Sequence, residues 1–293
     1  MKTRIPVLRI LTAVIGIPLA IILIFWNWDT FFAKDIPFAV AIGIISVMGA
    51  HEFYNGMIKM GARPIRWAGI TAVALFVLAA RGLGQLSLTA IFPAILTALI
   101  FLSFTAEMAR KERAPLMNIG GTVYGAIYVG WLISHLIVLR NMPGRLTVCG
   151  CEADLGSWFV MLTFLCTWAC DTGAYFTGQA IGKHKLAPHL SPNKTIEGAV
   201  GGLLGSVVIA CVAVPLMGLP FYHGIILGVL CGVLSQVGDL SESAIKREIG
   251  IKDFGKFVPG HGGILDRFDS ILFTAPAVYY YVIIVLKDVL NII

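Results

Sequence analysis

Long apolar segments separated by short polar connections dominate the chain. A helix that spans a bilayer needs about 20 mostly apolar residues. Nine segments come close to that length: residues 5–26, 36–54, 67–81, 88–106, 119–139, 157–180, 197–219, 222–240 and 269–290. No stretch between them is long enough for a soluble domain. The pattern therefore predicts an all-α polytopic membrane protein with about nine transmembrane helices.

The composition agrees with a membrane protein. Of the 293 residues 58% are hydrophobic and 13% are charged, whereas soluble domains carry about 25% charged residues. The net charge is +6, but the sequence has no basic tract with interleaved aromatic residues. We therefore expect the protein to interact with the lipid bilayer and not with a nucleic acid. The six cysteines form no disulfide framework. Cys166, Cys170, Cys211 and Cys231 are expected to be small buried apolar groups, and for the loop residues Cys149 and Cys151 a metal site is a minor alternative. The first apolar run lacks a cleavage site and is predicted to be retained.

Lys and Arg are distributed unevenly over the predicted connections. One side of the membrane holds 17 of the 22, and the other holds Lys34, Arg81, Arg140, Arg145 and Lys287. The positive-inside rule then predicts a cytoplasmic N-terminus, an outer C-terminus and a polar site on the cytoplasmic side. We expect one membrane domain over residues 1–293, in which 1–155 is a scaffold and 156–293, which holds the charged motifs, is the catalytic part.

Charge is concentrated between residues 235 and 270. Four side chains recur every fourth position along one helical face, with Lys246 beside them: Ser235, Asp239, Ser243 and Arg247. Asp266 and Asp269, three residues apart, open the ninth helix. Gly260, Gly262 and Gly263 lie in the connection, where a glycine backbone can closely approach a phosphate. Carboxylates beside cations suit nucleotide polyphosphate chemistry, and a solvated loop is the plainer alternative.

Two further motifs precede this segment. Asp171 lies about fourteen residues into a helix, a depth at which an ionisable group is a functional candidate, with an ion-pair role as the alternative. Residues 191–197 have the composition of a helix start, and Lys194 beside free N–H groups indicates a phosphate site. His184 and His189 are weaker candidates for ligands. Glu52, at the end of a helix, favours a capping or interfacial role over a catalytic one.

These carboxylates are expected to reach one face of the membrane. Asp171, Asp239, Asp266 and Asp269 would repel one another unless a cation neutralised them. The sequence therefore predicts one or two bound metal ions, Mg²⁺ first, with a second metal or a monovalent cation left open. A purely electrostatic staple of the fold is the alternative.

The same residues resemble a known family. Ser243-x-x-Lys246-Arg247, Lys252-Asp253-x-Gly255 and Pro259-x-His261-Gly262-Gly263-Ile264-x-Asp266-Arg267-x-Asp269 resemble the signature of bacterial phosphatidate cytidylyltransferase, the CDP-diacylglycerol synthase. Val258 is a mild departure, since a larger residue is usual there. Asp171-Thr-Gly-Ala-Tyr and Ser191-Pro-Asn-Lys-Thr-x-Glu-Gly are similar to that family as well, and the motifs together cover roughly residues 170 to 270.

The resemblance implies a function in phospholipid biosynthesis. It implies transfer of CMP from CTP to phosphatidic acid, with Mg²⁺, a homodimer and the bacterial cytoplasmic (inner) membrane as setting. Asp239 and Asp266 are expected to bind the metal ion. Asp171 and Asp269 are expected either to bind it as well or to lie next to the residues that do. The triphosphate and the lipid phosphate would be held by Lys194, Lys246, Arg247, Lys252 and Arg267. Substrate contacts are expected from Ser191, Asn193, Thr195, Ser243, His261, Gly262 and Gly263.

Three alternatives stay open at this point. A CTP-dependent polyprenol kinase would share carboxylates, cations and a lipid substrate but would transfer the γ-phosphoryl group. A CDP-alcohol phosphotransferase is less favoured, because its Asp-Gly-x-x-Ala-Arg motif does not occur. An ion-coupled transporter would place its charges at the midplane and not at one face. Acyl-chain preference, CTP against dCTP, the cytosine-binding residues and the route of lipid entry have no signal in the sequence.

Overall fold

The computed structural model describes residues 4–26, 35–83, 87–148, 150–255, 257 and 262–290, with backbone only for residues 4–13, 83, 87 and 88. Most of the described elements are helices, and the contacts within the chain divide it into two units. Unit 1 comprises Met1–Asn141 and Lys246–Phe268, and unit 2 comprises Met142–Ile245 and Asp269–Ile293. The predicted division at residue 155 concerns where the polar motifs lie, and it stays a prediction.

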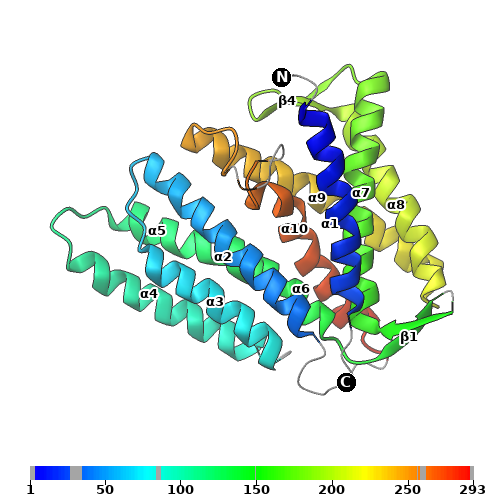
Figure 1. Cartoon of the computed structure of the whole chain (residues 1–293), viewed down its shortest axis with the longest axis horizontal. Helices are drawn as coiled ribbons and strands as arrows, with labels where there is room; N and C mark the ends of the chain where they lie inside the picture. The colour runs from blue at the N-terminus through cyan, green and yellow to red at the C-terminus, as the bar shows by residue number, and fades with distance from the viewer. Residues whose placement is uncertain are drawn as a thin grey trace. The chain divides into compact units, whose positions relative to one another are not determined.

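The helices of unit 1 begin with α1 (Arg4–Phe25), α2 (Ile36–Lys59) and α3 (Arg66–Leu83). A π-helical turn, η1 (Ser87–Ile91), leads into α4 (Phe92–Met108). Three further segments, α5 (Pro115–Gly125), η2 (Ala126–Trp131) and α6 (Leu132–Arg140), follow one another directly and form a single span. Neighbours in sequence pack side by side, α2 on α3, α3 on α4 and α4 on α5 (Figure 1).

Unit 2 is built on α7 (Leu155–Ile181) and α8 (Ile196–Leu216), which lie alongside each other (Figure 1). Glycines allow the close approach, because a Cβ on Gly173 would lie 2.6 Å from the carbonyl oxygen of Gly201. Small residues are a common way for membrane helices to pack closely. The helices α9 (Phe221–Ile249) and α10 (Leu265–Tyr281), the latter followed by η3 (Val282–Leu286), contribute residues to both units.

Each of the nine predicted helices has a counterpart among the described elements, so the polytopic all-α class is confirmed. Seven described helices are long and apolar enough to cross a membrane, and Val14–Phe25 is a shorter apolar one. Several predicted ends were wrong by four residues or more, among them those of four helices: α2 continues from residue 54 to Lys59, α5 begins at Pro115 and not at 119, α9 continues from residue 240 to Ile249, and α10 begins at Leu265 and not at 269. The extra turns of α9 are rich in polar residues, and Glu, Lys and Arg favour a helix even outside the bilayer.

Two short hairpins were not predicted. Strands β1 (Arg145–Val148) and β2 (Cys151–Asp154) pair antiparallel, with Arg145 opposite Asp154 and Val148 opposite Cys151. Strands β3 (Lys185–Ala187) and β4 (Ser191–Thr195) pair in the same sense, with Lys185 opposite Thr195. These strands are only three to five residues long and mostly polar, so they lack the alternation of apolar and polar residues by which a strand is predicted.

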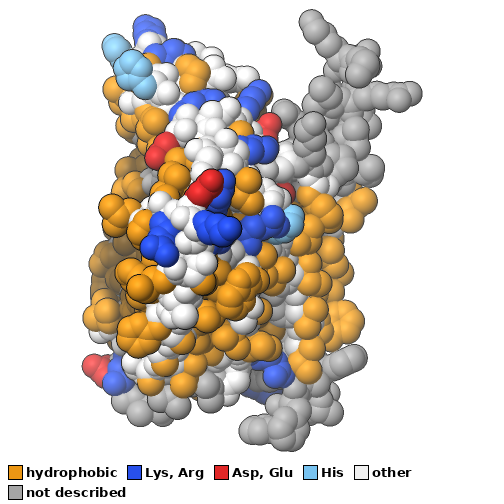
Figure 2. All heavy atoms as spheres, turned by 90° about the vertical axis from the view of Figure 1, so that its left-hand side faces the viewer, with side chains coloured by type: hydrophobic (Ala, Val, Ile, Leu, Met, Phe, Trp, Pro, Cys, Tyr) orange, Lys and Arg blue, Asp and Glu red, His pale blue; other side chains and the backbone are white. Residues whose placement is uncertain are grey.

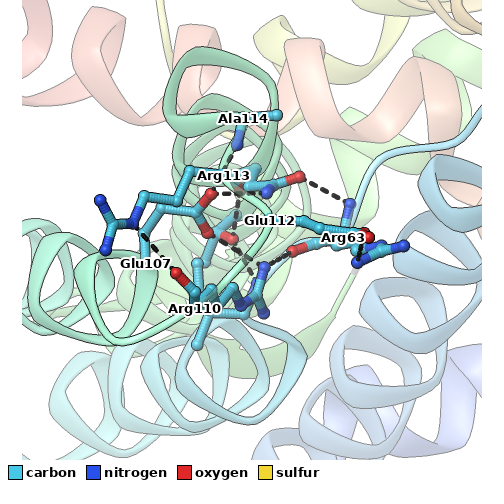
Figure 3. Close-up of polar contacts among 9 residues, drawn as sticks. Arg63, Glu107, Arg110, Glu112, Arg113 and Ala114 are labelled. Carbon is cyan, nitrogen blue, oxygen red and sulfur yellow. Dashed lines mark hydrogen bonds and ion pairs between the residues drawn. The ribbon is translucent and has the colours of Figure 1, made fainter.

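A buried carboxylate joins two connections of unit 1 (Figure 3). Glu107 is 2% exposed; its Oε1 accepts from the Ala114 N–H (2.9 Å) and the Asn118 amide (2.7 Å), and its Oε2 from Arg110 (3.0 Å). Asn118 in turn accepts from the N–H of Arg63 (2.7 Å), and Arg110 donates to the Arg63 carbonyl. The α2–α3 and α4–α5 connections are therefore held together by hydrogen bonds as well as by packing.

We expect Glu107→Ala to lower the free energy of unfolding by about 3 kcal/mol, because it leaves Asn118 and Arg110 with unpaired polar groups. Glu112→Ala is the matched control. Its ion pair with Arg63 is 76% and 64% exposed, and exposed pairs contribute about 0–1 kcal/mol. Thermal unfolding of the detergent-solubilised variants measures both, and equal losses would contradict the assignment.

Candidate functional site

The predicted site residues fall into two groups, one in each unit. Unit 1 contains those of the α9 end, the following loop and the start of α10: Lys246, Arg247, Lys252, Gly262, Gly263, Asp266 and Arg267. Unit 2 contains Asp171 on α7, Ser191, Asn193, Lys194 and Thr195 on β4, Asp239 and Ser243 on α9, and Asp269 on α10. His261 lies outside the described residues. Each group is described by itself.

Asp266 is the buried centre of the unit 1 group. Its side chain is 2% exposed. Oδ1 accepts from Lys246 Nζ (2.8 Å), and Oδ2 accepts from the backbone N–H groups of Phe254 (3.0 Å) and Gly263 (2.8 Å). These three contacts tie the end of α9 and two points of the loop to the first turn of α10. The carboxylate stabilises the loop, and its assignment as a metal ligand stays a prediction.

Glycines admit this arrangement. Gly262 has φ +89°, a left-handed conformation that residues with a Cβ rarely adopt. A Cβ on Gly263 would lie 2.5 Å from Glu52 Oε2 and 2.7 Å from the backbone nitrogen of Gly255. The loop therefore packs backbone against backbone beside a carboxylate, and this close approach is the structural reason for Gly255 and Gly263 in the signature.

Glu52 is the partner from α2. Its Oε2 accepts from the backbone N–H of Leu265, the first residue of α10, at 3.0 Å. A helix N-terminus has unsatisfied N–H groups and favours a negative charge. Glu52 is thus a capping residue, the role favoured from the sequence. The helix that it caps could not have been found from the sequence, because the two residues are 213 positions apart.

We expect Glu52→Ala to accelerate amide hydrogen exchange in the first turn of α10, residues 265–268, about tenfold, since one charge-assisted hydrogen bond is lost. Glu52→Gln keeps an acceptor oxygen and should stay close to the parent protein. Exchange in α3, also in unit 1, is the internal control. If both variants exchange at the parental rate in this turn, the capping role is wrong.

Around the Asp266 contacts, the same unit presents cations. Arg247, Lys252 and Arg267 are exposed, whereas Lys246 is 14% exposed and bound to Asp266. Lysine is a common phosphate binder and arginine can bind a phosphate through two parallel hydrogen bonds. The unit 1 group therefore combines a rigid loop with exposed cations, a combination suited to phosphate.

The unit 2 group contains an ion pair between two predicted site residues. Lys194 Nζ lies 2.5 Å from Asp239 Oδ2, with side chains 25% and 36% exposed. Lys194 is placed by the start of α8, where Thr195 is the N-cap and its hydroxyl accepts from the Gly198 N–H at 3.1 Å. The predicted helix start is confirmed, with Ser191–Thr195 forming β4 directly before it.

The remaining residues of this group are placed by their own elements. Asp171 is exposed on α7, and Asp269 Oδ1 accepts from the Ser270 N–H at 2.7 Å. His184, a weak ligand candidate, binds Glu197 through Nδ1 at 2.6 Å and so fastens the β3–β4 hairpin to α8. Gln236 was missed by sequence reasoning. It donates to the carbonyl of Ala199 at 3.0 Å and links α9 to α8 within unit 2.

The donor set is compatible with Mg²⁺ in its chemistry. Among the described residues, no three His, Cys, Asp or Glu side chains form a cluster that could by itself hold a metal ion. Mg²⁺ does not require such a cluster, because it is commonly held by one or two carboxylates together with substrate phosphates and water. Asp239, with a partly exposed carboxylate, meets that requirement, and the metal stays a prediction.

A multi-pass helical protein that combines carboxylates, cations and a glycine-rich loop belongs to the class of membrane proteins that handle phosphate-bearing substrates. The chain belongs to the cytidylyltransferase family, whose sequence pattern matches residues 7–285. The resemblance seen in the motifs is thereby confirmed.

Proteins of known name share much of the sequence. A protein named phosphatidate cytidylyltransferase from Synechocystis sp. is 35% identical over 307 aligned positions, which cover 98% of this chain and 99% of the relative. Proteins of the same name from Bacillus subtilis and Staphylococcus saprophyticus are 36% and 37% identical over 64% and 62% of this chain, and 66% and 65% of the relatives.

Proposed function

We propose that this protein is a phosphatidate cytidylyltransferase, which transfers CMP from CTP to phosphatidic acid and releases pyrophosphate. The observation that carries the proposal is the loop of unit 1: Asp266 and Glu52 brace it, and exposed Arg247, Lys252 and Arg267 lie on it and on the helix ends beside it. The name carried by a relative that covers 98% of the chain supports it.

The reaction replaces one phosphoanhydride bond at the α-phosphorus of CTP with another. An oxygen of the lipid phosphate attacks the α-phosphorus of CTP, a new P–O bond forms, and the bond from the α-phosphorus to the bridging oxygen breaks. The leaving pyrophosphate takes the electron pair. A phosphate monoester has a second pKa of about 6, so it is already an effective nucleophile near neutral pH and needs no general base.

The chain's own residues bind and orient these groups. Cations at Lys194, Arg247, Lys252 and Arg267 would hold the phosphates and stabilise charge that develops on the leaving group. Asp239, Asp266, Asp171 and Asp269 are the carboxylates that would hold Mg²⁺, which when bound neutralises phosphate charge. Lys246 is bound to Asp266, so its main proposed role is to orient the loop.

We further propose a cytoplasmic site in a bacterial cytoplasmic membrane, a cytoplasmic N-terminus and a homodimer. The distribution of Lys and Arg supports the orientation. Labelling of single cysteines from either side of intact vesicles would test it.

The decisive assay uses purified protein in detergent with phosphatidic acid, CTP labelled at the α-phosphate and Mg²⁺. We expect the label in the lipid fraction, with one pyrophosphate per lipid formed. Label that stays in water-soluble CDP would instead favour a CTP-dependent lipid kinase. Absence of turnover with lipid and metal both varied would overturn the proposal.

A further inference from the structure

Basic residues gather at one end of unit 1, away from the predicted site residues in the sequence. The two connections α2–α3 and α4–α5 and the residues that flank them, 59–66 and 107–113, contain six basic and two acidic residues. We call the six basic residues the basic rim: Lys59, Arg63, Arg66, Arg110, Lys111 and Arg113. Figure 2 looks onto this end and shows Lys and Arg side chains gathered among hydrophobic ones. A local excess of positive charge therefore lies where membrane helices end.

Part of the basic rim is held in a fixed arrangement. The buried Glu107 binds Arg110, and Arg110 donates to the backbone carbonyl of Arg63, so the two connections stay together (Figure 3). Between them is a hollow of about 530 Å³ lined by Arg63, Arg110, Lys111 and Glu112. Arg63 lies 2.6 Å from Glu112. The three cations of the hollow are thus partly neutralised, Arg63 by the internal counter-ion Glu112 and Arg110 by Glu107, and they exceed the two carboxylates by one charge.

Apolar side chains surround these cations. Trp67 is 59% exposed beside Arg66, and Met108 and Leu116 are 70% and 94% exposed on either side of the α4–α5 connection. Tryptophan beside basic residues is typical of the boundary between lipid and water. Of the most apolar window of the span Thr89–Met108, only 17% is buried inside the protein, so the rest of the described protein leaves most of this window uncovered.

A groove between α3 and α4 could hold an acyl chain. It has a volume of about 290 Å³ and an apolar lining that includes Ala68, Leu75, Ala98 and Leu102. Its lining reaches Ala68, two residues after Arg66 of the basic rim, and Leu102, six residues before the end of α4. The charged hollow lies on the connections that precede α3 and follow α4, and the apolar groove lies between these two helices. A headgroup site next to an acyl-chain groove matches the two parts of a phospholipid.

We propose that the basic rim binds the phosphate of an anionic membrane phospholipid, and that the α3–α4 groove holds one of its acyl chains. Zwitterionic lipids carry their own cation and gain less from an excess of positive charge. None of these residues belongs to the predicted catalytic groups, so the proposal does not depend on the proposed function.

The test counts bound lipid on the full-length protein in detergent by native mass spectrometry, with phosphatidylglycerol and phosphatidylcholine as probes. We expect phosphatidylglycerol to bind more tightly than phosphatidylcholine. Each cation near an anionic lipid contributes roughly a fivefold factor in affinity, so Arg63→Gln with Lys111→Gln should weaken phosphatidylglycerol binding about 25-fold. Glu112→Gln should strengthen it, because the internal counter-ion is removed. Ala98→Phe fills the groove and should weaken it as well.

Arg145→Gln is the matched control. Arg145 forms an ion pair with Glu152 in unit 2 that is as exposed as the Arg63–Glu112 pair. An equal loss of lipid in the control, or unchanged binding in the double variant, would overturn the proposal. Cytidylyl transfer measured on the same variants should be unchanged, and loss of folding is checked by their circular dichroism.

Discussion

Asp239→Asn is expected to lower kcat for CMP transfer by about 100- to 1,000-fold, the usual effect of removing one preorganised electrostatic group. The same change should move the free energy of unfolding by less than about 1 kcal/mol. The reason is exposure: Asp239 and Lys194 form a close ion pair at 2.5 Å, but their side chains are 36% and 25% exposed. Water screens such a pair, so it contributes little to folding, while its carboxylate remains accessible to a substrate or a metal ion.

A double-mutant cycle separates catalysis from structure at this pair. If Asp239 only neutralised Lys194, then Asp239→Asn combined with Lys194→Gln would recover activity relative to either single variant. We expect instead that the double variant is as inactive as Asp239→Asn. Glu152→Gln, which breaks a still more exposed pair with Arg145, is the control and should retain full activity. Near-parental activity of Asp239→Asn at every Mg²⁺ concentration would contradict the metal role.

The helices could be predicted because lipid imposes a simple rule. Every backbone polar group in the bilayer must find a partner within the protein, and a single apolar run of about 20 residues can satisfy all of its own groups only as a helix. The rule stops at the membrane boundary. Beyond residue 240, α9 continues on charged residues to Ile249, and β4 forms before α8 from residues that look like loop. Neither has an apolar pattern to reveal it.

The chemical groups of the candidate site could be predicted, but their contacts could not. Asp266 was expected beside phosphate or metal, and it proves to hold a loop through Phe254 and Gly263. Glu52 and Leu265, or Arg63 and Asn118, are joined by hydrogen bonds across 213 and 55 positions. Such contacts depend on which helices are neighbours, and a single sequence has no periodicity that reports this. The residue types of the candidate site indicate which chemistry it can perform, whereas the hydrogen-bond partners of each residue depend on how the helices pack.

Asp266→Asn should differ from Asp239→Asn, because Asp266 is buried. We expect its free energy of unfolding to fall by about 3–5 kcal/mol, the cost of removing one partner of a buried charged pair. The single oxygen of asparagine can still accept from the N–H groups of Phe254 and Gly263. Its NH₂ group would then face Lys246, which is 14% exposed and would have lost its carboxylate. Thermal unfolding in detergent measures the loss.

Removing the unpaired charge of Lys246 distinguishes a structural role of Asp266 from a catalytic one. Asp266→Asn combined with Lys246→Met should recover most of the lost stability, because no unpaired ammonium group remains buried. Activity should not return with it, since the loop would lack both the carboxylate and the cation that fix its ends. Recovery of activity together with stability would mean that Asp266 serves the fold alone, and the metal ligands would then have to be sought among Asp171, Asp239 and Asp269. If the double variant regains stability without turnover while Lys246→Met alone keeps its turnover, then Asp266 both holds the loop and takes part in the chemistry.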